Sequence, residues 1–160
     1  MAKEAINDFE PGMYFDFPLL DHRLQYTVDL SKVGCSCNAA LYFLKMPGYD
    51  ASQQPDPSDW KNYYCDADQV AGEFCPDMDV AEANRYTMAS TAHKCDKPEG
   101  KHYSNCDKVG CGTNMYDTSP TAMCPEEKCT INTQKPYTHQ IDFIQGEQDG
   151  KLAEIKNTFL

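Results

Sequence analysis

Nine cysteines in a chain of 160 residues constrain the fold more than any other feature of this sequence. Such a density is typical of a disulfide framework and is rare in a reducing compartment. The alternative is zinc, which prefers cysteines paired across about two to four residues. The closely spaced cysteines here are Cys35 with Cys37, Cys106 with Cys111, and Cys124 with Cys129. These spacings favour small closed disulfide loops over zinc, and the odd count leaves at least one thiol free or bonded to another chain.

The N-terminal stretch from Met1 to Phe9 carries acidic residues and no apolar run, so it shows no secretory signal peptide. A disulfide-rich chain without a leader is most simply a mature or trimmed sequence. We therefore expect an extracytoplasmic, oxidising location, either secreted or in the lumen of an organelle. The longest apolar runs, such as Ala39–Leu44, are far shorter than the ~20 residues of a transmembrane helix, so we expect no transmembrane segment.

The chain is acidic, with 25 Asp and Glu against 14 Lys and Arg and a net charge of −11. A surface of this charge repels phosphate backbones, so we expect no nucleic-acid partner. Some loop carboxylates offer the oxygen ligands that calcium takes, although a solvated acidic surface explains them more simply. These are Asp50, Asp56, Asp59, Asp66 and Asp68. We expect no metal site and no cofactor.

Short alternating segments predict an all-β fold. Leu24 to Leu30 alternates apolar and polar residues, as a half-buried strand does. Further strands are expected at 40–46, 78–83, 140–144 and 152–159, the last two joined across Gly146 and Gly150. The segment 90–136 is rich in Cys, Pro, Gly and Asp without periodicity and predicts a long loop region held by disulfides. We expect an irregular segment over 1–18 and a single domain over 19–160.

The acidic segment at the strand candidate 78–83 contains Asp77, Asp79 and Glu82 within six residues. In a regular strand Asp77 and Asp79 share a face and Glu82 points the other way. A β-bulge between Asp79 and Glu82 would bring all three to one face, because bulges re-aim side chains. A retaining glycosidase needs a nucleophile and an acid/base whose carboxyl groups lie about 5–5.5 Å apart. The alternative is a solvated acidic strand face.

The same segment, Asp77-Met-Asp-Val-Ala-Glu-Ala-Asn84, resembles the Glu-Met-Asp-x-Trp-Glu-Ala-Asn motif of glycoside hydrolase family 7, the cellobiohydrolases and endoglucanases. The resemblance runs from about residue 19 to about residue 159. Its other landmarks are Asn38-Ala-Ala-Leu-Tyr-Phe43, Tyr64-Cys-Asp66, Thr91-Ala-His-Lys-Cys95 and the two short cysteine loops.

The resemblance implies a truncated, concanavalin-like jelly-roll β-sandwich with long disulfide-stapled loops. It implies Asp77 as nucleophile, Asp79 as the residue that tunes it and Glu82 as acid/base. It further implies His93 as a substrate-binding residue, with Trp60 and Tyr86 as aromatic surfaces for a β-glucan; packing is the alternative for all three. The disulfides implied are Cys65–Cys75, Cys95–Cys124 and Cys106–Cys111. Of the remaining cysteines, Cys129 is expected to bond Cys35 or Cys37.

The departures from the family bear on activity. Asp77 replaces Glu and is one methylene shorter, Ala81 replaces the motif's Trp, and Trp60 is the single Trp of the chain. Family catalytic domains are also more than twice as long. We therefore expect a non-catalytic, family-7-derived structural or binding subunit of a larger assembly, with a protein partner covering the missing half of the sandwich. The alternatives are a retaining β-1,4-glucan hydrolase and a carbohydrate-binding module.

Overall fold

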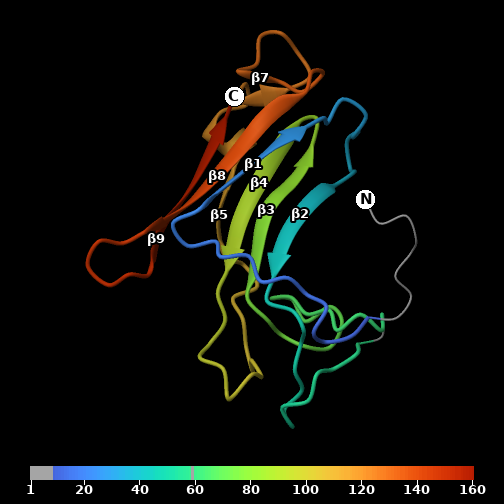
Figure 1. Cartoon of the computed structure of the whole chain (residues 1–160). Coiled ribbons are helices and arrows are strands. Elements are labelled where there is room, and N and C mark those ends of the chain that lie inside the picture. Colours follow the sequence, from blue (N-terminus) through green and yellow to red (C-terminus); the bar gives the residue numbers. More distant parts are fainter. Residues whose placement is uncertain (1–8, 59) are drawn as a thin grey trace. The chain divides into compact units, whose positions relative to one another are not determined.

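A computed structural model describes residues 9–58 and 60–160, and these are almost entirely strands and loops. The strands are β1 (Arg23–Val28), β2 (Ala39–Leu44), β3 (Asp77–Asn84), β4 (Thr87–His93), β5 (Cys111–Asn114), β6 (Met123–Cys124), β7 (Ile131–Asn132), β8 (Tyr137–Gln145) and β9 (Leu152–Phe159), and the single turn of helix is α1 (Met115–Thr118). The predicted all-β class is confirmed, and each of the five predicted strands is present (Figure 1). Residues 9–18 contain no helix or strand, whereas residues 1–8 of the predicted irregular segment lie outside the described residues.

The prediction of one long loop over 90–136 is wrong. This segment contains the end of β4, all of β5, α1, β6 and β7. Strand β4 lacks an apolar alternation because only Met88 is fully buried and the residues after it are small or polar. Its place in the sheet is set by pairing with neighbouring strands, and side-chain periodicity does not record such pairing.

The chain divides into two compact units, and several strands pass from one to the other. The first unit comprises residues 1–15, 42–79 and 91–112, and the second comprises 16–41, 80–90 and 113–160. A four-stranded sheet has the order β2-β3-β4-β5, a three-stranded sheet has the order β1-β8-β9, and β6 pairs with β7. The boundary between the units crosses β3 after Asp79, so the acidic strand contributes residues to both. The division into segments 1–18 and 19–160 stays a prediction.

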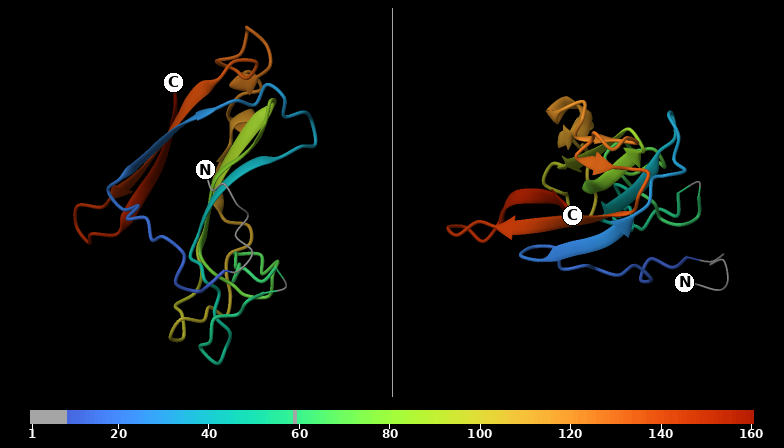
Figure 2. Two further views of the ribbon diagram at one scale, coloured as in Figure 1. Left: turned by 45° about the vertical axis from the view of Figure 1, so that its right-hand side comes forward. Right: turned by 90° about the horizontal axis from the view of Figure 1, so that it is seen from above.

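The second unit holds an apolar core. Strand β8 runs antiparallel to both β1 and β9, with Leu24 opposite Ile141 and Phe143 opposite Ile155 (Figure 2). Alternate residues of β8 are buried, as expected for a strand with one face toward the core. The core cluster consists of Leu30, Ala81, Ala83, Met88, Met123 and Tyr137.

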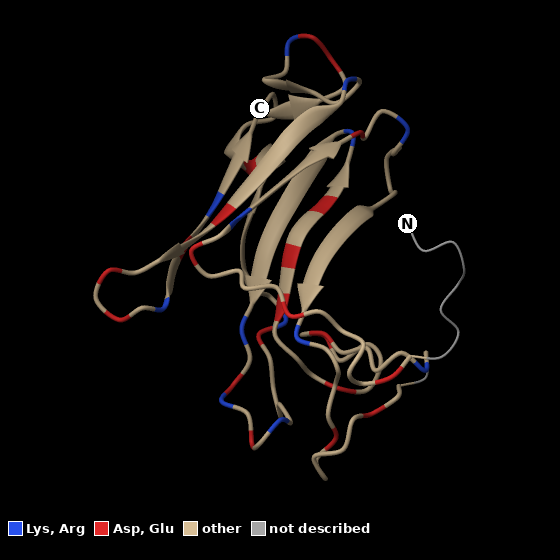
Figure 3. Ribbon diagram, viewed as in Figure 1, with Lys and Arg blue, Asp and Glu red and all other residues tan. Residues whose placement is uncertain are grey.

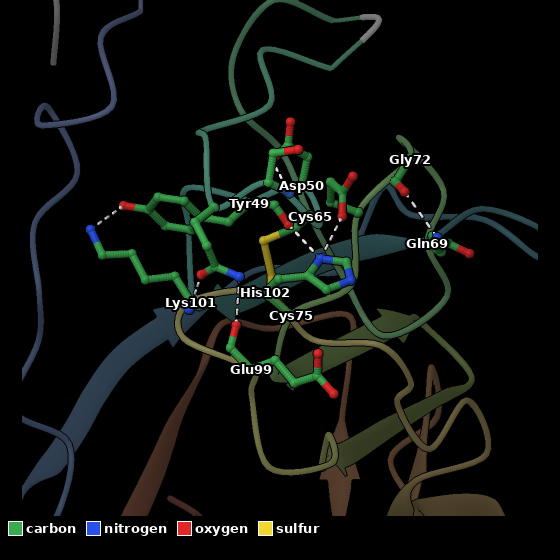
Figure 4. A network of polar contacts seen from close by, with 12 residues as sticks. Tyr49, Asp50, Cys65, Gln69, Gly72, Cys75, Glu99, Lys101 and His102 are labelled. Atoms are coloured by element: carbon green, nitrogen blue, oxygen red, sulfur yellow. Dashed lines mark hydrogen bonds and ion pairs between the residues drawn. A yellow bond between two sulfur atoms is a disulfide. The ribbon is translucent and has the colours of Figure 1, made fainter.

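The first unit is held together by cross-links and polar contacts between its loops (Figure 4). The buried disulfide Cys65–Cys75 joins one pair of loop segments. Gln53 joins another pair, because its amide donates to the carbonyl of Glu99 at 2.7 Å and accepts from the backbone N–H of Lys101 at 2.6 Å.

The disulfides agree with the predicted pairing at only one of the three bonds. Cys65–Cys75 is confirmed, but Cys95 bonds Cys106 and Cys124 bonds Cys129. The predicted bonds Cys95–Cys124 and Cys106–Cys111, and the predicted bond from Cys129 to Cys35 or Cys37, are therefore wrong. Cys95 and Cys106 face each other across an antiparallel bridge, and a turn in which the Cys129 N–H donates to the Glu126 carbonyl brings Cys129 back to Cys124. The thiols of Cys35, Cys37 and Cys111 remain free and exposed.

Candidate active site

Strand β3 carries the acidic residues that the sequence singled out, and carboxylates recur along it (Figure 3). Asp77 and Asp79 belong to the first compact unit, whereas Glu82 belongs to the second. Asp79 is buried, and Asp77 and Glu82 are half-buried. A bulge that brings the three carboxylates to one face stays a prediction.

Asp79 and His93 form the centre of the cluster in the first unit. His93 Nε2 lies 3.2 Å from Asp79 Oδ2, and the two side chains are only 10% and 13% exposed. The other ring nitrogen, Nδ1, lies 2.8 Å from the carbonyl oxygen of Asp107. A carbonyl oxygen only accepts, so Nδ1 carries a proton and donates it. A proton must also lie between Nε2 and the carboxyl group of Asp79, and the raised pKa of His93 favours its position on the imidazole.

The environment of His93 supports its charged form. Burial alone lowers the pKa of His93, but the contact with the Asp107 carbonyl and the charges of Asp79 and Asp77 outweigh it and raise that pKa. Hydrogen bonds and nearby opposite charges favour the protonated form of a base in this way.

The surroundings that favour a charged His93 favour a neutral Asp77. Its Oδ1 atom is buried and has no hydrogen-bond partner among the residues that the structure describes. Burial raises the pKa of Asp77 to about 7, and the Asp79 charge adds to the rise while His93 opposes it. A carboxyl group in such surroundings is neutral at acidic pH, because a buried charge next to a like charge is costly.

Glu82 has a separate environment in the second unit. Its Oε1 accepts a hydrogen bond from the side-chain amide of Asn38 at 3.1 Å. Its strand neighbours Ala81 and Ala83 are both part of the core cluster, so the alternation of a strand turns Glu82 away from that core. The amide donor suits an ionised carboxylate, which is an acceptor only.

The aromatic residues predicted to contact sugar are exposed but lie in different units. Trp60, in the first unit, is 53% exposed and leans against Tyr64, with ring centroids 4.8 Å apart. Tyr86, in the second unit, is 40% exposed, and the Arg85 guanidinium lies 5.2 Å from its ring. The structure thus brings His93 together with Asp77 and Asp79, and it leaves the roles of Trp60 and Tyr86 as predictions.

Three residues of these sites were not singled out in the sequence: Asn38, Asp107 and Gly110. Asn38 has no local signal, because its partner Glu82 is distant in the chain. The short run from Asp107 to Gly110 does carry one, since an Asp followed by Gly is typical of a tight turn. Among the described residues, no group of three or more His, Cys, Asp or Glu side chains is arranged to hold a metal ion. Asp59, one of the calcium candidates, lies outside that described part.

An all-β fold with a buried carboxylate cluster on one strand is typical of a class of proteins that includes the β-sandwich glycosidases. The family model of glycosyl hydrolase family 7 matches residues 52–160, and the chain belongs to this family. The predicted resemblance and the β-sandwich fold class are therefore confirmed.

The relatives and solved structures similar to this chain are considerably longer than it is. The probable endo-beta-1,4-glucanase celB of Aspergillus clavatus is 32% identical over 170 residues, which cover 89% of this chain and 39% of the relative. The native endocellulase EGI of Humicola insolens superposes with a TM-score of 0.70 at 26% identity, covering 89% of this chain and 42% of that one. A family 7 cellobiohydrolase of Daphnia pulex, at 23% identity, shares the fold with a TM-score of 0.74 over 90% of this chain and 44% of its own. The chain therefore spans about 40% of the length of these proteins.

Two general properties accompany the family membership. Three disulfides fit an extracellular or otherwise oxidising compartment. No helix in the described part of the chain has the length and apolarity to cross a membrane.

Proposed function

We propose that this chain is a non-hydrolytic member of glycosyl hydrolase family 7 that acts as a binding or structural subunit of a larger assembly. The observation that carries the proposal is the state of Asp77, which stands where the family motif has its nucleophile. Its buried Oδ1 lacks a hydrogen-bond partner among the described residues, and its pKa is raised to about 7 by burial and by Asp79.

A neutral carboxyl group is a poor nucleophile. The retaining mechanism forms a covalent glycosyl intermediate on an ionised carboxylate. Because burial and the Asp79 charge raise the pKa of Asp77, its carboxyl group favours the neutral form at acidic pH. The shorter Asp side chain adds a second deficit, because a misplacement of about 1 Å costs about 100-fold in rate.

The place of Ala81 supports the same proposal. Ala81 occupies the position of the Trp in the family motif, and it is buried in the core cluster with Met88 and Tyr137. A small side chain there contributes packing to the core, where the family motif carries an aromatic ring.

The edges of the three-stranded sheet support the proposal of a protein partner. Strands β1 and β9 are the outer strands of the three-stranded sheet. Edge strands present unpaired backbone groups that another chain can bind. The proposed partner is a protein that covers this part of the sandwich, and a β-glucan is a possible second ligand.

The second candidate is a retaining β-1,4-glucan hydrolase, with Asp77 as nucleophile, Asp79 as its tuning neighbour and Glu82 as acid/base. It is favoured by the buried Asp79–His93 pair and by the endoglucanase names of relatives. A carbohydrate-binding module is the third candidate, supported by the exposed rings of Trp60 and Tyr86.

A single set of assays separates the three. The purified chain and a Glu82→Gln variant are incubated with soluble cello-oligosaccharides between pH 4 and pH 9, and both product and binding are measured. The proposal predicts no product in either protein. Product that is formed by the native chain and lost in Glu82→Gln would overturn it. Saturable binding without product in a chain that runs as a monomer in gel filtration would assign the binding module, whereas the proposal expects a stable complex with a protein partner.

A further inference from the structure

The turn formed by residues 106–110 contacts one edge of the His93 ring at two points. We call this segment the His93 turn, and it lies in the first unit together with the carboxylate cluster. The carbonyl of Asp107 accepts from His93 Nδ1 at 2.8 Å. Gly110 packs against the same edge of the ring, so closely that an added Cβ would lie 2.7 Å from Cε1 and 2.8 Å from Nδ1.

The His93 turn is fixed to the rest of the unit at several points. The Cys95–Cys106 disulfide closes its start, and the Asp107 N–H donates to the Lys94 carbonyl at 2.8 Å. Within the turn, Asp107 Oδ1 accepts from the N–H groups of Val109 and Gly110 at 3.2 and 3.1 Å. Lys108 Nζ donates to the carbonyl of Asp68 at 3.0 Å.

Glycine is the one residue type that fits at position 110. Its φ of +70° lies in the left-handed region, which favours glycine. Any side chain would in addition collide with Thr91 Cγ2, which lies 2.6 Å from the place of a Cβ, and with the His93 ring. The close approach therefore depends on the missing side chain.

We propose that the His93 turn, through Gly110 and the Asp107 carbonyl, is a positioning device that sets where the protons of the carboxylate cluster lie. It holds the His93 ring with Nδ1 bonded to the carbonyl and Nε2 aimed at Asp79. The imidazolium then faces the Asp79 carboxylate, and its positive charge lowers the pKa of Asp77, which burial and Asp79 raise.

The charged groups that act on His93 come from two directions. Asp79 and Asp77 face it from β3, with Asp79 in contact at 3.2 Å. On the side of the turn, the contact is the backbone carbonyl of Asp107, whose carboxylate is engaged within the turn itself. A displaced ring therefore loses both of its hydrogen-bond partners at once. This role of the turn is the same whether the site hydrolyses glucan or only binds it.

The test is an NMR titration of the imidazole of His93 and the carboxyl carbon of Asp77 in the full chain, free of ligand. In Gly110→Ala the added Cβ meets the Nδ1–Cε1 edge of the ring, so the ring cannot keep its place between Asp107 and Asp79, and the pKa of His93 should fall below its native value. Because the His93 charge lowers the pKa of Asp77, the pKa of Asp77 should rise in the same variant. A general loosening of the unit would instead admit water and lower the pKa of Asp77, since burial is the largest cause of its rise.

Matched variants keep the test decisive. Gly150→Ala serves as control, because Gly150 also has a positive φ of 66° but lies in the second unit, in the β8–β9 connection. Asp107→Ala removes the side-chain bonds that shape the turn without adding a side chain at Gly110, and Asp107→Asn retains an acceptor at Oδ1. We expect the opposed shifts in Gly110→Ala and, more weakly, in Asp107→Ala, and native values in the other two.

Two results would overturn the proposal. One is an unchanged His93 pKa in both Gly110→Ala and Asp107→Ala. The other is a fall of the Asp77 pKa in a folded Gly110→Ala protein. If Gly110→Ala does not fold, Asp107→Ala against Asp107→Asn decides alone. All readouts are taken without glucan, so their failure is separate from the outcome of the hydrolysis assay.

Discussion

The two compact units of this chain are stabilised by different means. The second unit buries large apolar side chains, among them Leu30, Met88 and Ile141, and its strands β1 and β8 show regular alternation of burial. The buried residues of the first unit are mostly small or polar, and its loops are joined by disulfides and by side chains such as Gln53.

One histidine from each unit shows that the two units also differ in the electrostatic surroundings that they provide. His139, in the second unit, is fully buried, and burial lowers its pKa. It lies between the hydroxyl of Tyr26 and the amide oxygen of Asn157, at 2.7 and 2.8 Å, with no carboxylate in contact. His93, in the first unit, faces Asp79 and has a raised pKa. The comparison teaches that the surroundings of His139 favour its neutral form, whereas the carboxylate beside His93 favours its charged form.

The largest loss of stability is expected from a substitution in the second unit, whose core is apolar. Ile141 is fully buried in β8, so Ile141→Ala should lower the free energy of unfolding by about 2–5 kcal/mol through lost burial and a cavity. Denaturant titration measures the change. Ile144→Ala, at an exposed position of the same strand, is the control and should change little. Equal effects of the two substitutions would mean that β8 does not have one buried face.

In the first unit, the largest loss of stability should follow removal of the Cys65–Cys75 disulfide. The double variant Cys65→Ser, Cys75→Ser should lose about 2–3 kcal/mol, because a closed loop restricts the unfolded chain. Thermal unfolding of both proteins with and without a reductant measures it. A native protein that is insensitive to reductant would contradict this view of the first unit.

Replacing Asp77 should have a smaller effect that depends on pH. Its folded pKa of about 7 lies above the ordinary value of 3.8, so the folded state retains a proton that the unfolded state has released. The contribution of Asp77 to stability is therefore fully present below about pH 4 and is lost as the pH rises toward 7 and beyond. Asp77→Asn cannot ionise, so it should be more stable than the native chain at pH 8 by about 1–2 kcal/mol, allowing for partial exposure of the site.

The measurement is the difference in unfolding free energy between Asp77→Asn and the native chain at pH 4 and at pH 8. Asp96→Asn, a change of the same kind at an exposed position, is the control. A difference that does not grow with pH would show that Asp77 is not held neutral in the folded protein.

The smallest effect is expected at His139. Tyr26→Phe removes the hydroxyl that donates to His139 Nδ1 and should cost about 1 kcal/mol. Because the folded pKa of His139 is lowered, its contribution is present above its ordinary value of 6.5 and is lost as the pH falls below it. Unfolding experiments between pH 5 and pH 8 follow both changes, with Tyr116→Phe, at an exposed position, as the control. As the pH falls, the native chain should lose stability relative to a His139→Gln variant, because only the native chain has a buried imidazole to protonate. A native chain that gains stability relative to the variant would contradict a neutral His139.

Much of the fold could be predicted because its signals are local. Alternation of apolar and polar residues marked β1, and an apolar run marked β2. Strand β4 was missed because its residues after Met88 are small, and small side chains give no periodic pattern. Three disulfides were wrongly predicted because a pairing depends on which loops meet in space, as Cys95 and Cys106 do across an antiparallel bridge.

The candidate site was predictable to a similar degree. Its acids and His93 follow from residue type and spacing, but the contact between His93 and Asp79 joins two strands. The roles of Asp107 and Gly110 depend on a close approach of the backbone to one ring, which no residue pattern reports.

The charge of Asp77 is the central claim, and it can be measured directly. The carboxyl carbon of Asp77 is followed by NMR between pH 3 and pH 9 in the native chain, with Asp77→Asn to assign the signal. The carboxyl should be half-ionised near pH 7, with little change below pH 5. A midpoint near the ordinary value of 3.8 would contradict this account and favour the hydrolase, because Asp77 would then be ionised and available as a nucleophile.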